Sequence, residues 1–133
     1  MSPAHSRHGR VLVVDDNRDA ADSLAMVLQV LGYETGIAYD GAQALEVARR
    51  FLPEVVVLDI NMPVMDGYQV ARVLRQSSAE PRTVLVALTA RTTPEDECAA
   101  RDAGFDIHLA KPAGPEQVDR VLAQALEEAR QQA

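Results

Sequence analysis

Short apolar runs alternate along this chain with stretches in which apolar residues recur every three or four positions. The clearest run covers residues 10–14 and stops at Asp15. Continuous apolar runs of this length are typical of parallel strands that are buried on both faces. The intervening stretches have the spacing of one helix face, as in the series Leu24, Val27, Leu28 and Leu31. The pattern therefore predicts strands and helices in strict alternation.

We expect strands over residues 10–14, 33–39, 54–58, 83–88 and 105–110. We expect helices that end near residue 32, and that cover residues 41–52, 68–75, 94–104 and 115–130. Strict alternation indicates a parallel sheet with helices on both faces. About five strands favour a flavodoxin-like, doubly wound α/β fold, whose ligand site lies at the carboxyl ends of the strands.

The sequence also predicts how individual apolar side chains of two helices pack. Leu52 completes the inward face of the helix over residues 41–52. Cys98 is expected to be a small packing residue of the helix over residues 94–104. The other apolar residues of that helix are alanines, which bury little area, so we expect this helix to dock weakly.

Length and charge narrow the class of protein. The chain has 133 residues, enough for one domain, and a formal net charge of −7. An acidic chain repels phosphate backbones, so we expect no direct binding to nucleic acid, and no apolar run suggests contact with a membrane. A single cysteine excludes an internal disulfide and favours the cytoplasm.

We divide the chain into a flexible leader over residues 1–9, a domain over residues 10–130 and a tail over residues 131–133. Metal binding by His5 and His8 of the leader is a weaker alternative.

Charged and hydroxyl residues stand where the predicted strands end. Asp15 and Asp16 follow the first strand, Asp59 the third, Thr89 the fourth and Lys111 the fifth. The carboxyl ends of parallel strands meet at one edge of a sheet, so these side chains should converge. Two carboxylates ~4 Å apart repel by roughly 4 kcal/mol at an effective dielectric constant of 20. A cluster of oxygen ligands with one lysine therefore suggests Mg²⁺, with Mn²⁺ as a possible substitute.

A cation, an ammonium group and a hydroxyl around one carboxylate suggest phosphoryl transfer onto that carboxylate. An aspartate can act as a nucleophile and form an acyl phosphate. Positive groups would neutralise the charge on the oxygens of the phosphoryl group during transfer.

Four motifs resemble the receiver domain of bacterial response regulators, the CheY-like family. They are VLVVDDN over residues 11–17, LDINMPVMDG over 58–67, LTA over 88–90 and KP over 111–112. Their order and spacing match the family over residues 10–124, and the resemblance implies the strand order 2-1-3-4-5.

The resemblance implies a role for each residue of the cluster. Asp59 would accept the phosphoryl group from a phosphohistidine of a sensor histidine kinase or a histidine phosphotransfer protein. Asp16 would bind Mg²⁺ directly, Asp15 largely through water, and Asn61 through its backbone carbonyl. Lys111 would pair with the phosphoryl oxygens. The domain would catalyse its own phosphorylation and dephosphorylation, without turnover of an external substrate.

The resemblance also implies a conformational switch. Thr89 would move to the phosphoryl group with help from the Ala90 amide, and the signal would reach a downstream protein target through the fourth helix, fifth strand and fifth helix. The family has Tyr or Phe three residues before the lysine, whereas this chain has His108, which buries less apolar surface and can ionise near neutral pH. Arg91 stands where side chains of the family tune the lifetime of the acyl phosphate, and a cis peptide bond is expected before Pro112.

Several alternatives stay open at this point. The receiver domain could be free-standing, which the short leader favours, or could belong to a hybrid sensor kinase. An aspartyl phosphohydrolase of the haloacid-dehalogenase kind would need an acid two residues after Asp59, where Asn61 stands. A dinucleotide-binding domain would need a glycine-rich turn after the first strand, which is absent. A receiver that signals without phosphate would not need the complete set of acids, threonine and lysine.

Overall fold

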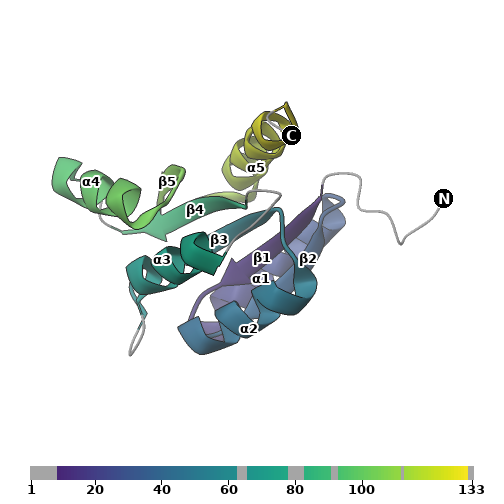
Figure 1. Cartoon of the computed structure of the whole chain (residues 1–133). Helices are drawn as coiled ribbons and strands as arrows, with labels where there is room; N and C mark the ends of the chain where they lie inside the picture. Colours follow the sequence, from purple (N-terminus) through teal and green to yellow (C-terminus); the bar gives the residue numbers. More distant parts are fainter. Residues whose placement is uncertain (1–8, 63–65, 78–82, 91–92, 112, 132–133) are drawn as a thin grey trace.

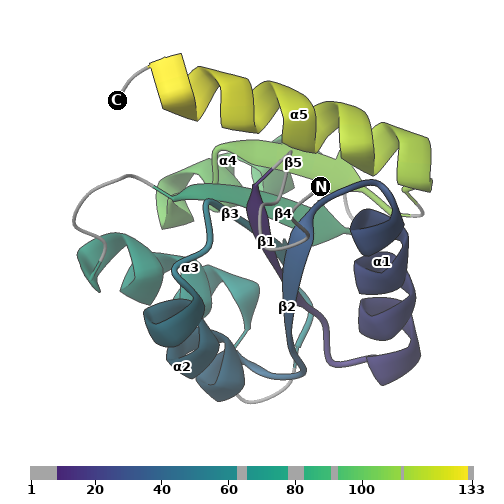
Figure 2. The ribbon, with the colours of Figure 1, turned by 90° about the vertical axis from the view of Figure 1, so that its right-hand side faces the viewer.

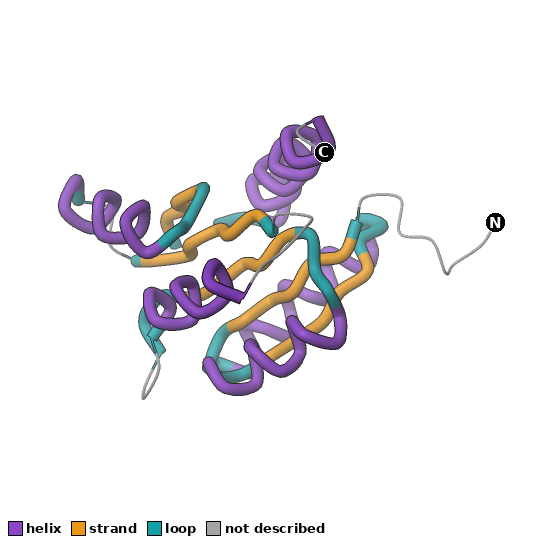
Figure 3. Tube along the Cα trace, in the orientation of Figure 1, coloured by secondary structure: helices purple, strands orange, loops and turns teal. Residues whose placement is uncertain are grey.

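Five parallel strands form the centre of the computed structural model, which describes residues 9–62, 66–77, 83–90, 93–111 and 113–131. They are β1 (Arg10–Val14), β2 (Glu34–Ala38), β3 (Val55–Asp59), β4 (Val84–Thr89) and β5 (Ile107–Ala110). Their order in the sheet is β2-β1-β3-β4-β5 (Figure 3). The predicted doubly wound order is confirmed, with β2 and β5 at the two edges.

Helices cover both faces of the sheet (Figures 1 and 2). They are α1 (Arg18–Val30), α2 (Gly41–Phe51), α3 (Gly67–Ser77), α4 (Pro94–Ala103) and α5 (Pro115–Gln131). The buried side chains of α1 and α5 belong to one core cluster, and those of α2, α3 and α4 belong to the other. None of the helices in the described ranges is long and apolar enough to span a membrane.

The central strands are buried because both of their faces meet a helical layer. All five residues of β3 are buried. In β1, Leu12 points into one core cluster, whereas Val11 and Val13 point into the other. This alternation explains why the sequence of a central strand is apolar at successive positions instead of at every second one.

Local signals at the helix ends agree with the structure. Asn17 caps α1 by accepting a hydrogen bond from the Ala20 N–H at 3.1 Å. Thr93 caps α4, Pro94 occupies its first turn, and Gly104 ends it in the left-handed region with φ of 111°. Both ends of this helix were predicted from the sequence.

Two packing predictions are wrong. Leu52 is 65% exposed, because α2 ends at Phe51 and Leu52 turns into the left-handed region with φ of 52°. Cys98 is exposed, because α4 docks through Ala100 and Ala103. A residue two positions before Ala100 lies on a different side of the helix. The fifth strand also begins later than predicted, since the Phe105 N–H still closes the end of α4 by donating to the Ala100 carbonyl.

Candidate functional site

Three carboxylates meet at the edge of the sheet where β1 and β3 end. Oxygen atoms of Asp15, Asp16 and Asp59 all lie within 4.8 Å of one another. Val14 pairs with Leu58 across the two strands, so the residues that follow them come out side by side. The convergence predicted from the strand ends is therefore present in the fold.

Lys111 brings a positive charge to this cluster from the far side of β4. Its Nζ lies 3.2 Å from Oδ1 of Asp59 and 3.8 Å from Oδ2 of Asp15. The Lys111 N–H donates to the Thr89 carbonyl at 2.8 Å, which fixes the segment after β5 to the end of β4. One ammonium group thus contacts two carboxylates that belong to different strands.

The backbone at the site holds both buried carboxylates in place. Oδ1 of Asp15 accepts a hydrogen bond from the Asn17 N–H at 3.0 Å, and Oδ1 of Asp59 accepts one from the Asn61 N–H at 3.1 Å. Asp15 and Asp59 are buried, whereas Asp16 is exposed. The cluster therefore has two fixed acids within the protein and one at the surface.

Burial raises the pKa of Asp59 above its ordinary value, because the charged form loses its hydration. Lys111 opposes this rise, whereas the negative charge of Asp15 adds to it. The loss of hydration is the largest of these effects, so the pKa of Asp59 is raised even with Lys111 in place. Oxygen ligands without sulfur or imidazole suit a hard divalent cation, so the cluster fits a site for an ion such as Mg²⁺.

Replacement of Asp59 by Asn is expected to stabilise the fold in metal-free buffer. A raised pKa means that the folded state binds the proton more tightly than the unfolded chain does. The resulting stability is complete below the pKa of the unfolded chain, and it is lost as the pH rises through the folded-state pKa. At pH 7 the ionised carboxylate thus opposes folding, and Asp59→Asn should raise the melting temperature by roughly 3–6 °C, for about 1 kcal/mol.

Thermal unfolding in a chelating buffer at pH 7 measures this effect. Asp102→Asn is the matched control, because it removes the same charge from an exposed position on α4. A lower melting temperature for Asp59→Asn than for Asp102→Asn would contradict the sign of the argument.

A close backbone contact beside Asp59 was not predicted from the sequence. Gly67 begins α3, and its N–H donates to the Ile60 carbonyl at 2.9 Å. A Cβ atom at Gly67 would lie 2.7 Å from the Ile60 Cα and 2.8 Å from the Asp59 carbonyl oxygen. In the sequence Gly67 is only the last residue of the LDINMPVMDG motif, and its close contact with the backbone of Asp59 could not be predicted without the structure.

The residues predicted to form a switch lie on β4 and β5. Thr89 is buried at the end of β4 and pairs with Ala110, and Ala90 beside it is exposed. The His108 side chain faces α4, where its Nδ1 lies 4.0 Å from Oε1 of Glu97. Its Nε2 is buried without a hydrogen-bond partner among the described residues.

Some predicted residues lie outside the described part of the chain. They are His5 and His8 of the leader, Pro63 of the LDINMPVMDG motif, Arg91, and Pro112 with its expected cis peptide bond.

Fold and site together define a CheY-like doubly wound domain with an acidic pocket at the carboxyl edge of its sheet. Residues 11–123 match the family described as response regulator receiver domain. The chain belongs to this family, and it is a receiver domain of two-component signalling.

Individual relatives agree with this assignment. The transcriptional regulatory protein PrrA of Mycobacterium tuberculosis is 44% identical over 103 residues, which cover 77% of this chain and 43% of PrrA. The DNA-binding response regulator MtrA of the same organism is 40% identical over 109 residues, which cover 82% of this chain and 46% of MtrA. The chain thus spans less than half the length of these curated relatives.

Solved structures show the same fold. The chemotaxis protein CheY4 of Vibrio cholerae superposes with a TM-score of 0.83 at 34% identity, over 87% of this chain and 97% of CheY4. The receiver domain of the Francisella response regulator 1452 superposes with a TM-score of 0.82 at 26% identity, over 90% of this chain and 98% of that domain.

Proposed function

We propose that Asp59 accepts a phosphoryl group from a phosphohistidine of a sensor histidine kinase or histidine phosphotransfer protein. The observation that carries this proposal is the short distance of 3.2 Å between Lys111 Nζ and Asp59 Oδ1, within reach of Asp15 and Asp16. Asp59 is the member of the cluster that touches the ammonium group most closely. A phosphoryl group on Asp59 would meet the same ammonium group.

The reaction is a displacement at phosphorus. A carboxylate oxygen of Asp59 attacks the phosphorus atom, and the bond from phosphorus to the imidazole nitrogen of the donor breaks. The electron pair of that bond stays on the imidazole, which takes up a proton. Lys111 neutralises the negative charge that gathers on the phosphoryl oxygens.

The acidic cluster supplies the residues for a metal ion. Asp15, Asp16, Asp59 and the backbone carbonyl of Asn61 would hold Mg²⁺, or Mn²⁺ in its place. When bound, the ion supplies positive charge to the phosphoryl oxygens. Hydrolysis of the acyl phosphate by water at the same site would return Asp59 to its free form.

The signal would leave the site through β4 and β5. Thr89 ends β4, one position beyond Leu88, which pairs with Asp59, and Ala90 follows it. His108 lies on β5, the next strand, and faces α4. We propose that a phosphoryl group on Asp59 draws Thr89 toward it, and that the change reaches a protein partner at the face formed by α4, β5 and α5.

Incubation with acetyl phosphate and Mg²⁺ is expected to add one phosphoryl group to the chain, and Asp59→Asn should abolish the addition. The asparagine keeps the shape of the side chain but has no nucleophilic carboxylate. Intact-mass spectrometry counts the groups added, and Asp102→Asn serves as the control with an equal change of charge. Equal labelling of Asp59→Asn and the unmodified chain would show that another residue is the acceptor.

A further inference from the structure

A small cavity of about 150 Å³ lies between α4 and β5, away from the acidic cluster. Its lining includes Glu97, Arg101, Phe105 and His108. Pockets for cofactors and drug-sized ligands measure roughly 300–1,000 Å³, so this cavity has room for one side chain of another molecule.

The cavity exists because α4 rests on small side chains. Its buried residues are Ala100 and Ala103, both in its C-terminal half. Alanine fills little of the space between a helix and a sheet, so a space is left beside Ala100, where α4 faces β5. The weak docking of α4 stays a prediction, and the structure adds an unfilled space between α4 and β5.

Glu97 is available at the mouth of this cavity. Its side chain is 50% exposed, and the 4.0 Å separation between its Oε1 and the His108 Nδ1 exceeds the length of a hydrogen bond. The other carboxylate of the lining, Asp106, is already engaged, because it pairs with Arg75 and accepts a hydrogen bond from the Leu85 N–H at 2.9 Å. Of the two carboxylates in the lining, Glu97 is thus the one available to bind a cation from another molecule.

Strand β5 lies near α4 and α5 (Figure 1), and both helices carry more acidic than basic residues in the sequence. The acidic residues of α4 are Glu95, Asp96, Glu97 and Asp102, against Arg101 alone. The described acidic side chains of α5 are Glu116, Glu127 and Asp119, against Arg120, and Asp119 accepts a hydrogen bond from the Tyr33 hydroxyl at 2.7 Å. A second copy of the chain that presented the same face would be repelled, whereas a basic segment of a different protein would be attracted.

We propose that this cavity receives an arginine side chain of the protein partner. The guanidinium group would pair with Glu97 and lie against the rings of His108 and Phe105, because a planar cation can form two hydrogen bonds to a carboxylate and stack on a flat ring. This inference rests on the proposed function in one respect, because it takes the face of α4, β5 and α5 as the surface that binds the partner. It adds the chemistry of the group that is recognised.

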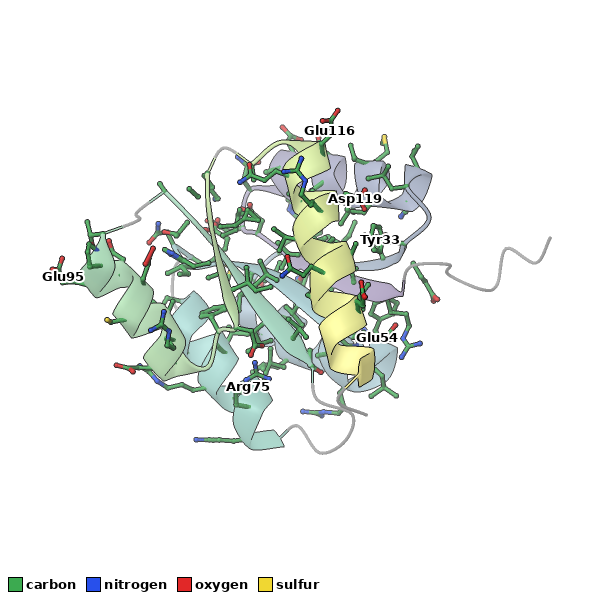
Figure 4. The ribbon with its side chains drawn as sticks, turned by 90° about the horizontal axis from the view of Figure 1, so that it is seen from above. Tyr33, Glu54, Arg75, Glu95, Glu116 and Asp119 are labelled. Carbon is green, nitrogen blue, oxygen red and sulfur yellow. The ribbon has the colours of Figure 1, made fainter. Side chains whose placement is uncertain are left out.

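Titration of the isotope-labelled full chain with the peptide Ac-Ala-Arg-Ala-NH2, followed by NMR at constant ionic strength, tests the proposal. We expect shifts of the backbone signals of Ala100, Ile107 and His108, which border the cavity. The variant E97Q should weaken binding at least fivefold. The matched control E95Q removes the same charge from the same helix at an exposed position (Figure 4), and it should change the affinity less than twofold.

Equal weakening by E97Q and E95Q would overturn the proposal, because binding would then follow the charge of α4 alone. Equal binding of Ac-Ala-Glu-Ala-NH2, or a concentration-dependent dimer that E97Q abolishes, would also overturn it. Labelling of Asp59 by acetyl phosphate, measured on the same samples, reports the proposed function separately. A chain that accepts phosphate but does not bind the arginine peptide would refute only the inference about the cavity.

Discussion

Replacement of Gly67 by alanine is expected to lower the free energy of unfolding by about 3 kcal/mol. The added Cβ would lie 2.7 Å from the Ile60 Cα and 2.8 Å from the Asp59 carbonyl oxygen. Both neighbours are backbone atoms, which cannot rotate away as a side chain would. Either α3 must move from the sheet, or the backbone of Asp59 must shift.

The same substitution should slow phosphorylation of Asp59 at least tenfold, since a displacement of about 1 Å in a reacting group can cost two orders of magnitude in rate. Denaturant unfolding gives the stability, and intact-mass spectrometry over time gives the rate. Gly114→Ala is the control, because among the described residues, its chain neighbours aside, no atom lies within 4 Å of a Cβ built at that position. Equal stability and equal rates in the two variants would show that the contact at Gly67 is easily relieved.

Replacement of Arg75 by methionine is expected to cost about 2 kcal/mol and to loosen the end of α4. Arg75 pairs with Asp106 and donates hydrogen bonds to the carbonyls of Gly104 at 2.8 Å and Thr83 at 2.5 Å. One side chain thus joins α3 to the segments that precede β4 and β5 (Figure 4). Hydrogen bonds to charged groups contribute about 1.5–3 kcal/mol each, and we take a low total because the Arg75 side chain is 20% exposed.

Hydrogen exchange locates the effect of this change. Amides of residues 100–107 should lose more protection in Arg75→Met than the lower global stability explains. Amides of β1 should lose only as much protection as the lower global stability explains. Arg72→Met is the control, because Arg72 is exposed on the same helix. A uniform loss of protection over the whole sheet would mean that Arg75 contributes to global stability without a special link to α4 and β5.

The alternation of elements and the convergence of the acids could be predicted from the sequence for a simple physical reason. A strand such as β3, buried on both faces, is apolar up to its last residue, and the charged Asp59 at that position marks the edge of the sheet. Once the strands are parallel, their carboxyl ends share that edge. The grouping of Asp15, Asp59 and Lys111 follows from topology without knowledge of any distance.

Other features depend on contacts between elements that are distant in the sequence. Arg75 appeared only as the last residue of a predicted helix, because its partners at Thr83, Gly104 and Asp106 lie in other segments. The exposure of Leu52 depends on a single left-handed residue at the end of α2. The exposure of Cys98 depends on the rotation of α4 about its axis, which a helix with only small apolar residues does not define in advance.

The small buried residues of α4 have a consequence for how the sequence of such a domain can change in evolution. Ala100 and Ala103 anchor the helix from beneath, and Pro94, Glu95, Glu97 and Cys98 along its exposed part contribute nothing to the core. None of these four residues belongs to the cluster of Asp15, Asp16 and Asp59, so substitutions there would leave its carboxylates in place. The exposed surface of α4 can therefore change in sequence while the residues of the acidic cluster stay the same.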